Sequence, residues 1–368
     1  MKVGDRKMRG IDEIDQNLAV TGTIGDTTVH FFNVRQKPFR IYGLLAGNAG
    51  EPFRRLPLQV AEQVSEGVKN LHSCTAGGRV RFRTNSDYIA IRAVMPGKEL
   101  MPQMSFLGSS GFDLYETVEG VFCFLGSFAP PIDREGQYES MVRLEGHRMR
   151  DLTIHFPLYD RVRDLFVGVE PGASLEEGGC YQDKPPILYY GSSITQGGCA
   201  SRPGNCYTNL ITARLNIDHV NLGFSGNGKG EQPIAEYIAE QPMSLFFCDY
   251  DYNAPSAEYL EQTHEAFFLT IREKNPDLPV ILASRALKLG EEREITLNRR
   301  AVILKTYENA LKRGDRKIRF VDGMTMFDEA GRLDMMADSC TVDGVHPNDL
   351  GFACMAKVFG RAIAEMLG

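Results

Sequence analysis

Residues 186 to 368 alternate short apolar runs with segments of helical character, and this alternation most restricts what the chain can fold into. The apolar runs are PILYYG, HVNLGF, SLFFCDYD, LPVILAS and IRFVDG. Near-continuous apolar strands joined by helices favour a parallel sheet covered on both faces. Ligands of such folds bind beyond the carboxyl ends of the strands, so the polar residues after each run are the candidates for chemistry.

Residues 1 to 170 follow a different pattern, with many short strand-like segments and little helix apart from PLQVAEQVSEGVKNLH. In RVRFRTNSDYIAIRAVM, apolar and polar residues alternate on both sides of a polar turn at 85–87, which predicts a hairpin. Such a pattern is typical of a β-sandwich or jelly roll. We therefore expect an N-terminal β domain over 1–170, a linker over 171–185 and an α/β domain over 186–368.

Composition limits the partners and the compartment. The net charge is 41 − 48 = −7, and no basic run stands out, which disfavours nucleic acid as a partner. The first twenty residues carry charges where a signal peptide needs an apolar run, and no stretch approaches a membrane span. The sequence thus predicts a cytoplasmic protein that does not bind membranes.

Eight cysteines are scattered without a C-x-x-C pair, which predicts reduced thiols and no zinc site. Cys123 and Cys248 lie in apolar runs and are expected in the core.

The strand ends carry the groups that acyl transfer to a serine requires: a hydroxyl, a base, a group that orients the base, and donors for an oxyanion. Ser193 can be the nucleophile, His346 the base and Asp343 the orienting carboxylate, while Gly226 and Asn253 can supply donors. Each has a simpler interpretation: Gly226 can serve a turn, Asn253 can cap the helix that follows, and Asp-x-x-His pairs are often structural. The conjunction carries the hypothesis.

These segments resemble the conserved blocks of the SGNH (GDSL-like) hydrolases. GSSIT is similar to the first block, NLGFSGN to the second, DYNA to the third and DGVHPND to the last, in the family's order. The resemblance implies a three-layer α/β/α flavodoxin-like domain. It also implies a catalytic triad of Ser193, Asp343 and His346, with an oxyanion hole from Ser193, Gly226 and Asn253. Two positions depart from the pattern: Ser192 replaces the family's Asp, and Asp251 stands where Gly is usual.

GFDLY, residues 111 to 115, resembles the signature of a β-rich, jelly-roll-like domain found ahead of some SGNH hydrolases. Asp113 and Tyr115 are expected to serve the sandwich rather than to border the active site. Proteins with this arrangement include carbohydrate esterases and acyltransferases. The resemblance therefore implies a serine esterase that deacetylates O-acetylated oligosaccharides or small molecules, without metal or cofactor. An acyltransferase, a non-catalytic carbohydrate-binding protein and a homo-oligomer are the alternatives that remain open.

Overall fold

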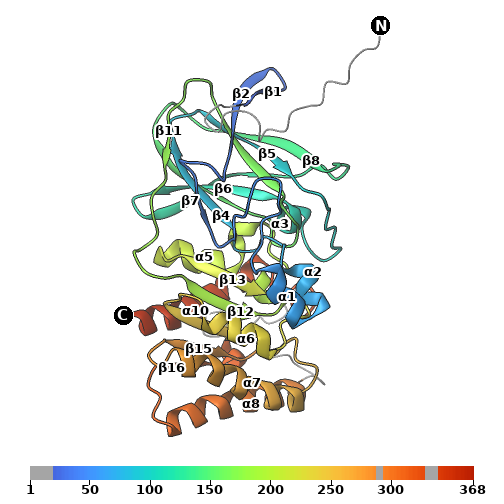
Figure 1. Cartoon of the computed structure of the whole chain (residues 1–368), viewed down its shortest axis with the longest axis vertical. Coiled ribbons are helices and arrows are strands. Elements are labelled where there is room, and N and C mark those ends of the chain that lie inside the picture. The colour runs from blue at the N-terminus through green and yellow to red at the C-terminus, as the bar shows by residue number, and fades with distance from the viewer. Residues whose placement is uncertain (1–19, 287–292, 328–338) are drawn as a thin grey trace.

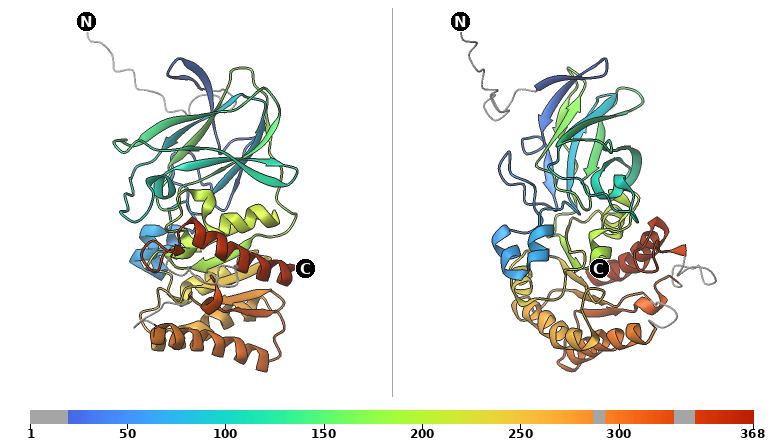
Figure 2. Two further views of the ribbon diagram at one scale, coloured as in Figure 1. Left: turned by 180° about the vertical axis from the view of Figure 1, so that it is seen from behind. Right: turned by 90° about the vertical axis from the view of Figure 1, so that its right-hand side faces the viewer.

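The computed structural model describes residues 20–286, 293–327 and 339–368. An antiparallel β region and an α/β region are stacked along the long axis of the molecule (Figures 1 and 2). The expectation of no export signal rests on residues 1–20. All of these except Val20 lie outside the described residues.

The N-terminal region is built from two antiparallel sheets with an apolar core between them. One has the strand order β1-β2-β10-β5-β8, and the other β11-β4-β9-β6-β7, with β3 also paired to β4. The strands are β1 (Val20–Ile24), β2 (Thr27–Asn33), β3 (Arg40–Tyr42), β4 (Arg79–Thr84), β5 (Tyr88–Val94), β6 (Phe112–Val118), β7 (Val121–Phe128), β8 (Gln137–Arg143), β9 (Arg150–His155), β10 (Asp164–Val169) and β11 (Leu175–Glu177). The sandwich is thus present, while the jelly-roll description stays a prediction.

The predicted hairpin around residues 85–87 is wrong. β4 pairs with β9 and β11, whereas β5 pairs with β10 and β8 of the opposite sheet. In the connection between them Ser86 is buried, and its hydroxyl donates to Tyr88 O at 2.6 Å and accepts from the Glu170 N–H at 3.0 Å. Alternation on both strands therefore reflects two sheets facing one core, not one ladder.

Three further expectations change in detail. The predicted helix over 57–72 is broken into α1 (Leu58–Val64) and α2 (Glu66–Leu71), because Ser65 is extended and its hydroxyl caps α2 by accepting from the Val68 N–H. Within the expected linker, β11 pairs with β4. Cys248 is buried as predicted, but Cys123 is only half-buried, because β7 lies at a sheet edge and its first residues are partly exposed.

The C-terminal region contains a parallel sheet of order β13-β12-β14-β15-β16, which is the 2-1-3-4-5 order of flavodoxin-like folds. Its strands are β12 (Ile187–Gly191), β13 (His219–Gly223), β14 (Leu245–Asp249), β15 (Val280–Ala283) and β16 (Ile318–Val321). The described helices of this region are α4 (Ser193–Gln196), α5 (Tyr207–Leu215), α6 (Gln232–Ala239), α7 (Ala257–Lys274), α8 (Arg293–Lys312) and α10 (Asp349–Leu367), with short 3₁₀ turns at Pro203–Asn205 and Gly323–Thr325. Helix α3 (Phe106–Ser110) belongs to the N-terminal region.

Helices cover both faces of this sheet. Ile187 and Tyr189 of β12 pack in a core with α5 and α10, while Leu188 and Tyr190 pack in a second core with α6, α7 and α8. The predicted strand–helix alternation is confirmed. The chain reverses direction across the sheet between β12 and β14, which is where doubly wound folds bind ligands.

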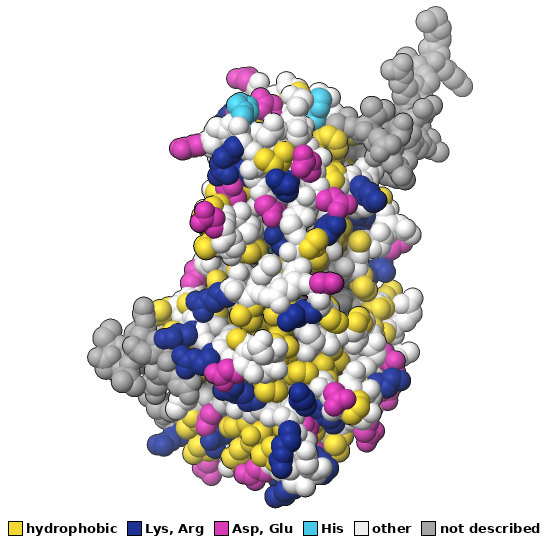
Figure 3. Space-filling view, turned by 90° about the vertical axis from the view of Figure 1, so that its left-hand side faces the viewer, with side chains coloured by type: hydrophobic (Ala, Val, Ile, Leu, Met, Phe, Trp, Pro, Cys, Tyr) yellow, Lys and Arg dark blue, Asp and Glu magenta, His cyan; other side chains and the backbone are white. Residues whose placement is uncertain are grey.

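The surface drawn in Figure 3 carries acidic and basic side chains interspersed over both regions, so this face presents no extended field of one sign.

Candidate active site

The two serines after β12 lie in different environments. Ser192 is the N-cap of α4, and its hydroxyl accepts a 3.2 Å hydrogen bond from the Ile194 N–H. Ser192 is fully buried. Ser193 begins the helix and remains 8% exposed, with its Oγ 2.8 Å from His346 Nε2. Ser192 thus satisfies a helix N–H, whereas Ser193 faces an imidazole.

Asp343 and His346 form a close pair. His346 Nδ1 lies 2.7 Å from Asp343 Oδ2, and Asp343 Oδ1 accepts from the backbone N–H groups of His346 at 2.7 Å and Val345 at 3.0 Å. Partial burial raises the pKa of Asp343, but the backbone and ring hydrogen bonds from His346 outweigh it and hold the pKa below its ordinary value. An ionised carboxylate at Nδ1 favours the tautomer whose Nε2 can accept the Ser193 proton.

Backbone hydrogen bonds fix the loop that carries this pair. The Val342 N–H donates to His346 O at 2.9 Å, and Thr341 forms a β-bridge with Pro347. From the loop after α4, the Cys199 N–H donates to Pro347 O at 3.0 Å. The segments that carry Ser193 and His346 are therefore joined by the backbone as well as by the contact between the two side chains.

Gly226 and Asn253 follow β13 and β14, the strands on either side of β12. Residues 224–228, called here the oxyanion loop after the role that the sequence predicts for Gly226, turn at Gly226, whose φ of 68° is unfavourable for residues with a Cβ. Asn253 Nδ2 donates to Phe224 O at 2.9 Å, and the Phe224 N–H donates to Gly191 O at 3.0 Å. The three strand ends are thus cross-linked, and Asn253 retains a second amide hydrogen.

The alternative role of Asn253 as a helix cap is excluded. The N-cap of α7 is Ser256, whose hydroxyl accepts a 3.2 Å hydrogen bond from the Tyr259 N–H.

Asp251, the residue that departs from the family pattern, is buried and anchors its loop. Its Oδ2 accepts from the Arg285 N–H at 3.0 Å, and its backbone carbonyl accepts from Arg299 at 2.6 Å. Burial raises the pKa of Asp251, and the nearby Arg285 charge opposes that shift. The substitution for Gly is therefore accommodated by two arginines, and the loop still brings Asn253 to the oxyanion loop.

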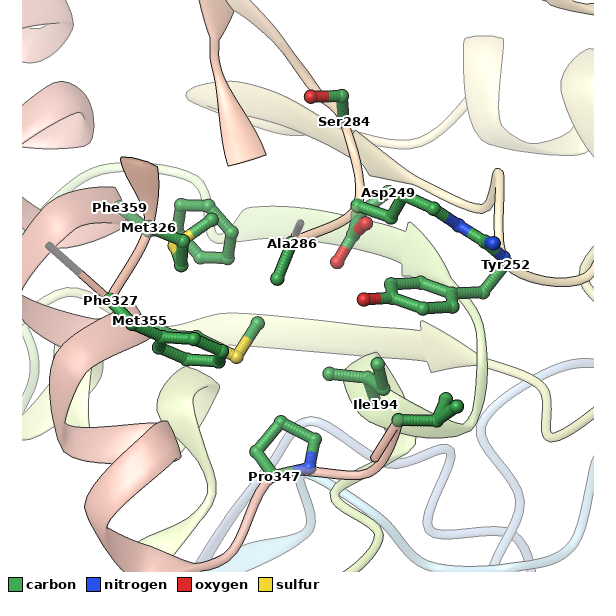
Figure 4. Close-up of a pocket in the computed structure, with 12 residues that line it drawn as sticks. Ile194, Asp249, Tyr252, Ser284, Ala286, Met326, Phe327, Pro347, Met355 and Phe359 are labelled. Atoms are coloured by element: carbon green, nitrogen blue, oxygen red, sulfur yellow. The ribbon is translucent and has the colours of Figure 1, made fainter. Parts of the chain in front are cut away.

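A small cavity lies between α4, α10 and the carboxyl end of the sheet (Figure 4). Ile194 and Pro347, the residues after Ser193 and His346, line one side, and Asp249 and Tyr252 point into it. Its volume, counted for the centre of a water molecule, is ≈ 10 Å³, which is room for about one water. Burial and the neighbouring Asp251 raise the pKa of Asp249 well above its ordinary value.

The GFDLY segment reaches the α/β region. The Asp113 carboxylate accepts a 2.8 Å hydrogen bond from the Gly204 N–H and forms a 3.1 Å ion pair with Arg202, both in the loop after α4. Its other oxygen lies 2.9 Å from His155 Nδ1. Arg202 also contacts the Tyr115 hydroxyl. Asp113 and Tyr115 thus act structurally, but they join the two regions rather than serving the sandwich alone.

Two supporting residues were not indicated by the sequence. The Tyr159 hydroxyl donates to Ser193 O at 3.1 Å, and Arg55 binds the carbonyls of Asn221 and Gly223 at the end of β13. Both come from the N-terminal region and are far in sequence from the groups they contact. Neither belongs to a motif, so no local signal could have identified them.

Metal-ligating side chains gather at one surface position among the described residues. Asp87, His147 and Glu170 place one ligand atom each within 4.8 Å of one another. The carboxylates approach different ring nitrogens, at 3.8 Å from Nε2 and 3.4 Å from Nδ1. The two carboxylates thus contact opposite nitrogens of one imidazole ring.

Comparison with known proteins agrees with this geometry. Residues 184–364 match the model of the GDSL-like lipase/acylhydrolase family, and residues 29–175 match the GxDLY family, the N-terminus of SGNH-hydrolase-type esterases. No curated protein matches the chain.

Three solved structures are similar over nearly their whole length. A protein described as a GDSL-like lipase from Bacteroides ovatus is 28% identical with a TM-score of 0.83, covering 92% of this chain and 98% of its own. The salicylyl-acyltransferase SsfX3 from a tetracycline biosynthetic pathway is 20% identical with a TM-score of 0.73, covering 92% and 97%. A family two carbohydrate esterase from Clostridium thermocellum, in complex with cellohexaose, is 11% identical with a TM-score of 0.63, covering 90% and 99%.

The fold and the family matches define an ester-hydrolysing enzyme of SGNH type. Residues 184–364 thus form a GDSL-like lipase/acylhydrolase region, and the GxDLY region of residues 29–175 precedes it. Among the described residues, no helix is both long and apolar enough to span a bilayer.

Proposed function

We propose that this enzyme is a serine esterase that works through an acyl-enzyme on Ser193 and removes acetyl groups from O-acetylated oligosaccharides. The observation that carries the proposal is the continuous hydrogen-bonded row from Ser193 Oγ to His346 Nε2, at 2.8 Å, and from His346 Nδ1 to Asp343 Oδ2, at 2.7 Å. A hydroxyl, an imidazole and a carboxylate in this order and at these distances are the groups of a serine hydrolase.

The mechanism follows from these contacts. His346 takes the proton of Ser193 as Oγ attacks the ester carbonyl carbon, and Asp343 stabilises the resulting imidazolium. The tetrahedral oxyanion receives hydrogen bonds from the backbone N–H groups of Ser193 and Gly226 and from the Asn253 amide. His346 then protonates the leaving alcohol. Water, deprotonated by His346, attacks the acyl carbon, and the acid is released as Ser193 regains its proton.

The carbohydrate assignment rests on similarity rather than on a described pocket. The structural neighbours include family two carbohydrate esterases, one with cellohexaose bound, and the GxDLY region is that of SGNH-type esterases. The acyltransferase neighbour shares the fold over the same length, so transfer of the acyl group to an alcohol is the second candidate. Both reactions use the same acyl-enzyme and differ in the nucleophile that resolves it.

The first experiment measures hydrolysis of p-nitrophenyl esters, from acetate to octanoate, by the wild type, Ser193→Ala and the control variant Ser140→Ala, whose serine lies on β8 of the sandwich. The proposal predicts turnover of acetate that disappears in Ser193→Ala and persists in Ser140→Ala. Acetate release from acetylated oligosaccharides, with and without an added alcohol acceptor, then separates hydrolysis from transfer. Turnover that survives in Ser193→Ala would rule out the acyl-enzyme on this residue.

A further inference from the structure

Arg55 is a buried cation held by four carbonyl groups. It is 2% exposed, and its Nε donates to Cys74 O at 2.7 Å while Nη2 donates to Leu71 O at 2.9 Å. Nη1 donates to Asn221 O at 3.1 Å and to Gly223 O at 2.6 Å. Arg55 thus ties the segment around α2 to the carboxyl end of β13.

The charge of Arg55 is not neutralised by a carboxylate within the described part of the chain. None of the ion pairs between described residues involves Arg55. Burial lowers the pKa of Arg55 to about 10, so its guanidinium stays charged at neutral pH. An unpaired buried charge is costly unless hydrogen bonds compensate it, and a neutral side chain would fill the same space without that cost. The position of the charge therefore calls for a reason.

Arg55 lies directly beneath the oxyanion loop. Its guanidinium carbon is 4.9 Å from the centre of the Phe224 ring, and Phe224 O accepts the hydrogen bond from Asn253. The neighbouring α2 packs tightly on the same loop, because a Cβ at Gly67 would lie 1.9 Å from Asn227 Oδ1. Arg55 and α2, both from the N-terminal region, thus contact this loop at Phe224 and at Asn227.

We propose that Arg55 is a positioning residue for the oxyanion loop: it fixes the end of β13, and through it Gly226 and Asn253. This inference deepens the proposed function and rests on it. Preorganised dipoles and charges in a water-poor site stabilise an oxyanion most effectively when they do not have to reorient.

Arg79 provides a matched control, because it also binds β13. It is fully buried and also comes from the N-terminal region, but it binds Asp218 and His219 at the amino end of β13, away from the oxyanion loop. Arg55→Lys and Arg79→Lys both keep a charge and both lose the planar, multidentate set of donors. If lysine lowered activity only by destabilising the fold, the two variants should lose activity to a similar extent.

The test measures kcat and KM for p-nitrophenyl acetate in both variants, in Asn253→Ala and in the double variant Arg55→Lys/Asn253→Ala, each verified as folded by thermal unfolding. We expect Arg55→Lys to lower kcat by about 10- to 100-fold with little change in KM, and Arg79→Lys to leave kcat within about two-fold. In the Asn253→Ala background, the Arg55→Lys effect should largely disappear because both act on one loop. Equal kcat losses in the two lysine variants, or fully multiplicative effects in the double variant, would overturn the inference.

Hydrogen–deuterium exchange of the peptide spanning 222–230 gives a readout that does not need turnover. Arg55→Lys should speed exchange of these amides and Arg79→Lys should not. If the wild type hydrolyses no ester, the proposed function fails, and exchange still decides whether Arg55 orders the loop. Unchanged exchange in Arg55→Lys would refute the positioning role whatever the activity.

Discussion

Arg202 and Asp113 form a 3.1 Å ion pair that joins β6 of the sandwich to the loop after α4. Asp113 is fully buried, so its removal leaves the side chains of Arg202 and His155 without their shared carboxylate partner. We expect Asp113→Ala to lower the free energy of unfolding by about 3 kcal/mol. Urea unfolding measures the loss. The matched control is Glu261→Gln, which breaks an exposed pair with Lys305 and should cost less than about 1 kcal/mol. Similar losses in both variants would contradict a joining role for Asp113.

The adjacent serines should separate stability from activity. Ser192→Ala removes the α4 cap and should cost about 1 kcal/mol of unfolding free energy, with kcat reduced only a few-fold. Ser193→Ala should abolish turnover with little loss of stability, because its hydroxyl caps no helix. Thermal unfolding and p-nitrophenyl acetate hydrolysis on the same samples measure both. The assignment is wrong if Ser192→Ala is the inactive variant.

Asn253 should contribute to kcat. Asn253→Ala removes an amide donor from the oxyanion and also frees Phe224 O, so kcat should fall by about 10²–10³-fold. Asn275→Ala is the control, since its amide likewise donates to a backbone carbonyl, Ala239 O at 2.9 Å, but at the far end of α7. A loss of only a few-fold in Asn253→Ala would remove it from the oxyanion hole.

Asp343 should act through its charge. Asp343→Asn keeps the shape but favours the wrong imidazole tautomer, so kcat should fall by about 10⁴-fold. The lowered pKa of Asp343 means that it stays ionised as the pH falls through the ordinary carboxyl range, and its stabilising contribution is lost only as the pH passes the folded value. The kcat of Asp343→Asn at pH 7 tests the first expectation, and a pH profile of kcat/KM from 4 to 9 should show no step from Asp343, because its pKa lies below this range. An Asp343→Asn variant with a tenth of wild-type activity or more would exclude the orienting role.

Buried His264 should make the protein sensitive to acid. Burial lowers its pKa from 6.5 to about 4, while its ring lies 2.9 Å from Thr306 Oγ1. The unfolded chain binds a proton below pH 6.5 and the folded chain does not until about pH 4, so stability falls across this window as the pH drops. At pH 5 this group should lower the free energy of unfolding by about 2 kcal/mol relative to neutral pH. Urea unfolding at pH 7.5 and pH 5 should show a smaller pH dependence in His264→Gln than in the wild type. The same dependence in both would show that other groups cause it.

Local patterns predicted the α/β half well. Each apolar run from PILYYG to IRFVDG became a parallel strand, because strands buried on both faces must be apolar throughout. The candidate residues after those strands were brought together because parallel strands end at one edge. Pairing in the sandwich was not predictable in this way: β4 and β5 look like a hairpin, but they pair with strands distant in sequence and belong to opposite sheets.

The support of the site was also beyond local reasoning. Arg55, Tyr159 and Arg202 each act through contacts between residues distant in sequence. A single arginine or tyrosine carries no pattern, so its role appears only when the two regions are packed together.

The two regions share a core, and this limits how the enzyme can be rearranged. Leu56, Ala61 and Val68 pack in one apolar cluster with Tyr190 and Ile234. A chimera joined at residues 171–185 would pack a foreign N-terminal region against α6. It would also replace the residues that contact the oxyanion loop. Short insertions should therefore be tolerated at an exposed hairpin tip such as 119–120, where a Cβ on Gly120 would meet no atom within 4 Å, whereas exchange of the whole N-terminal half at 171–185 should fail. In this enzyme the N-terminal half and the α/β half therefore have to be exchanged together.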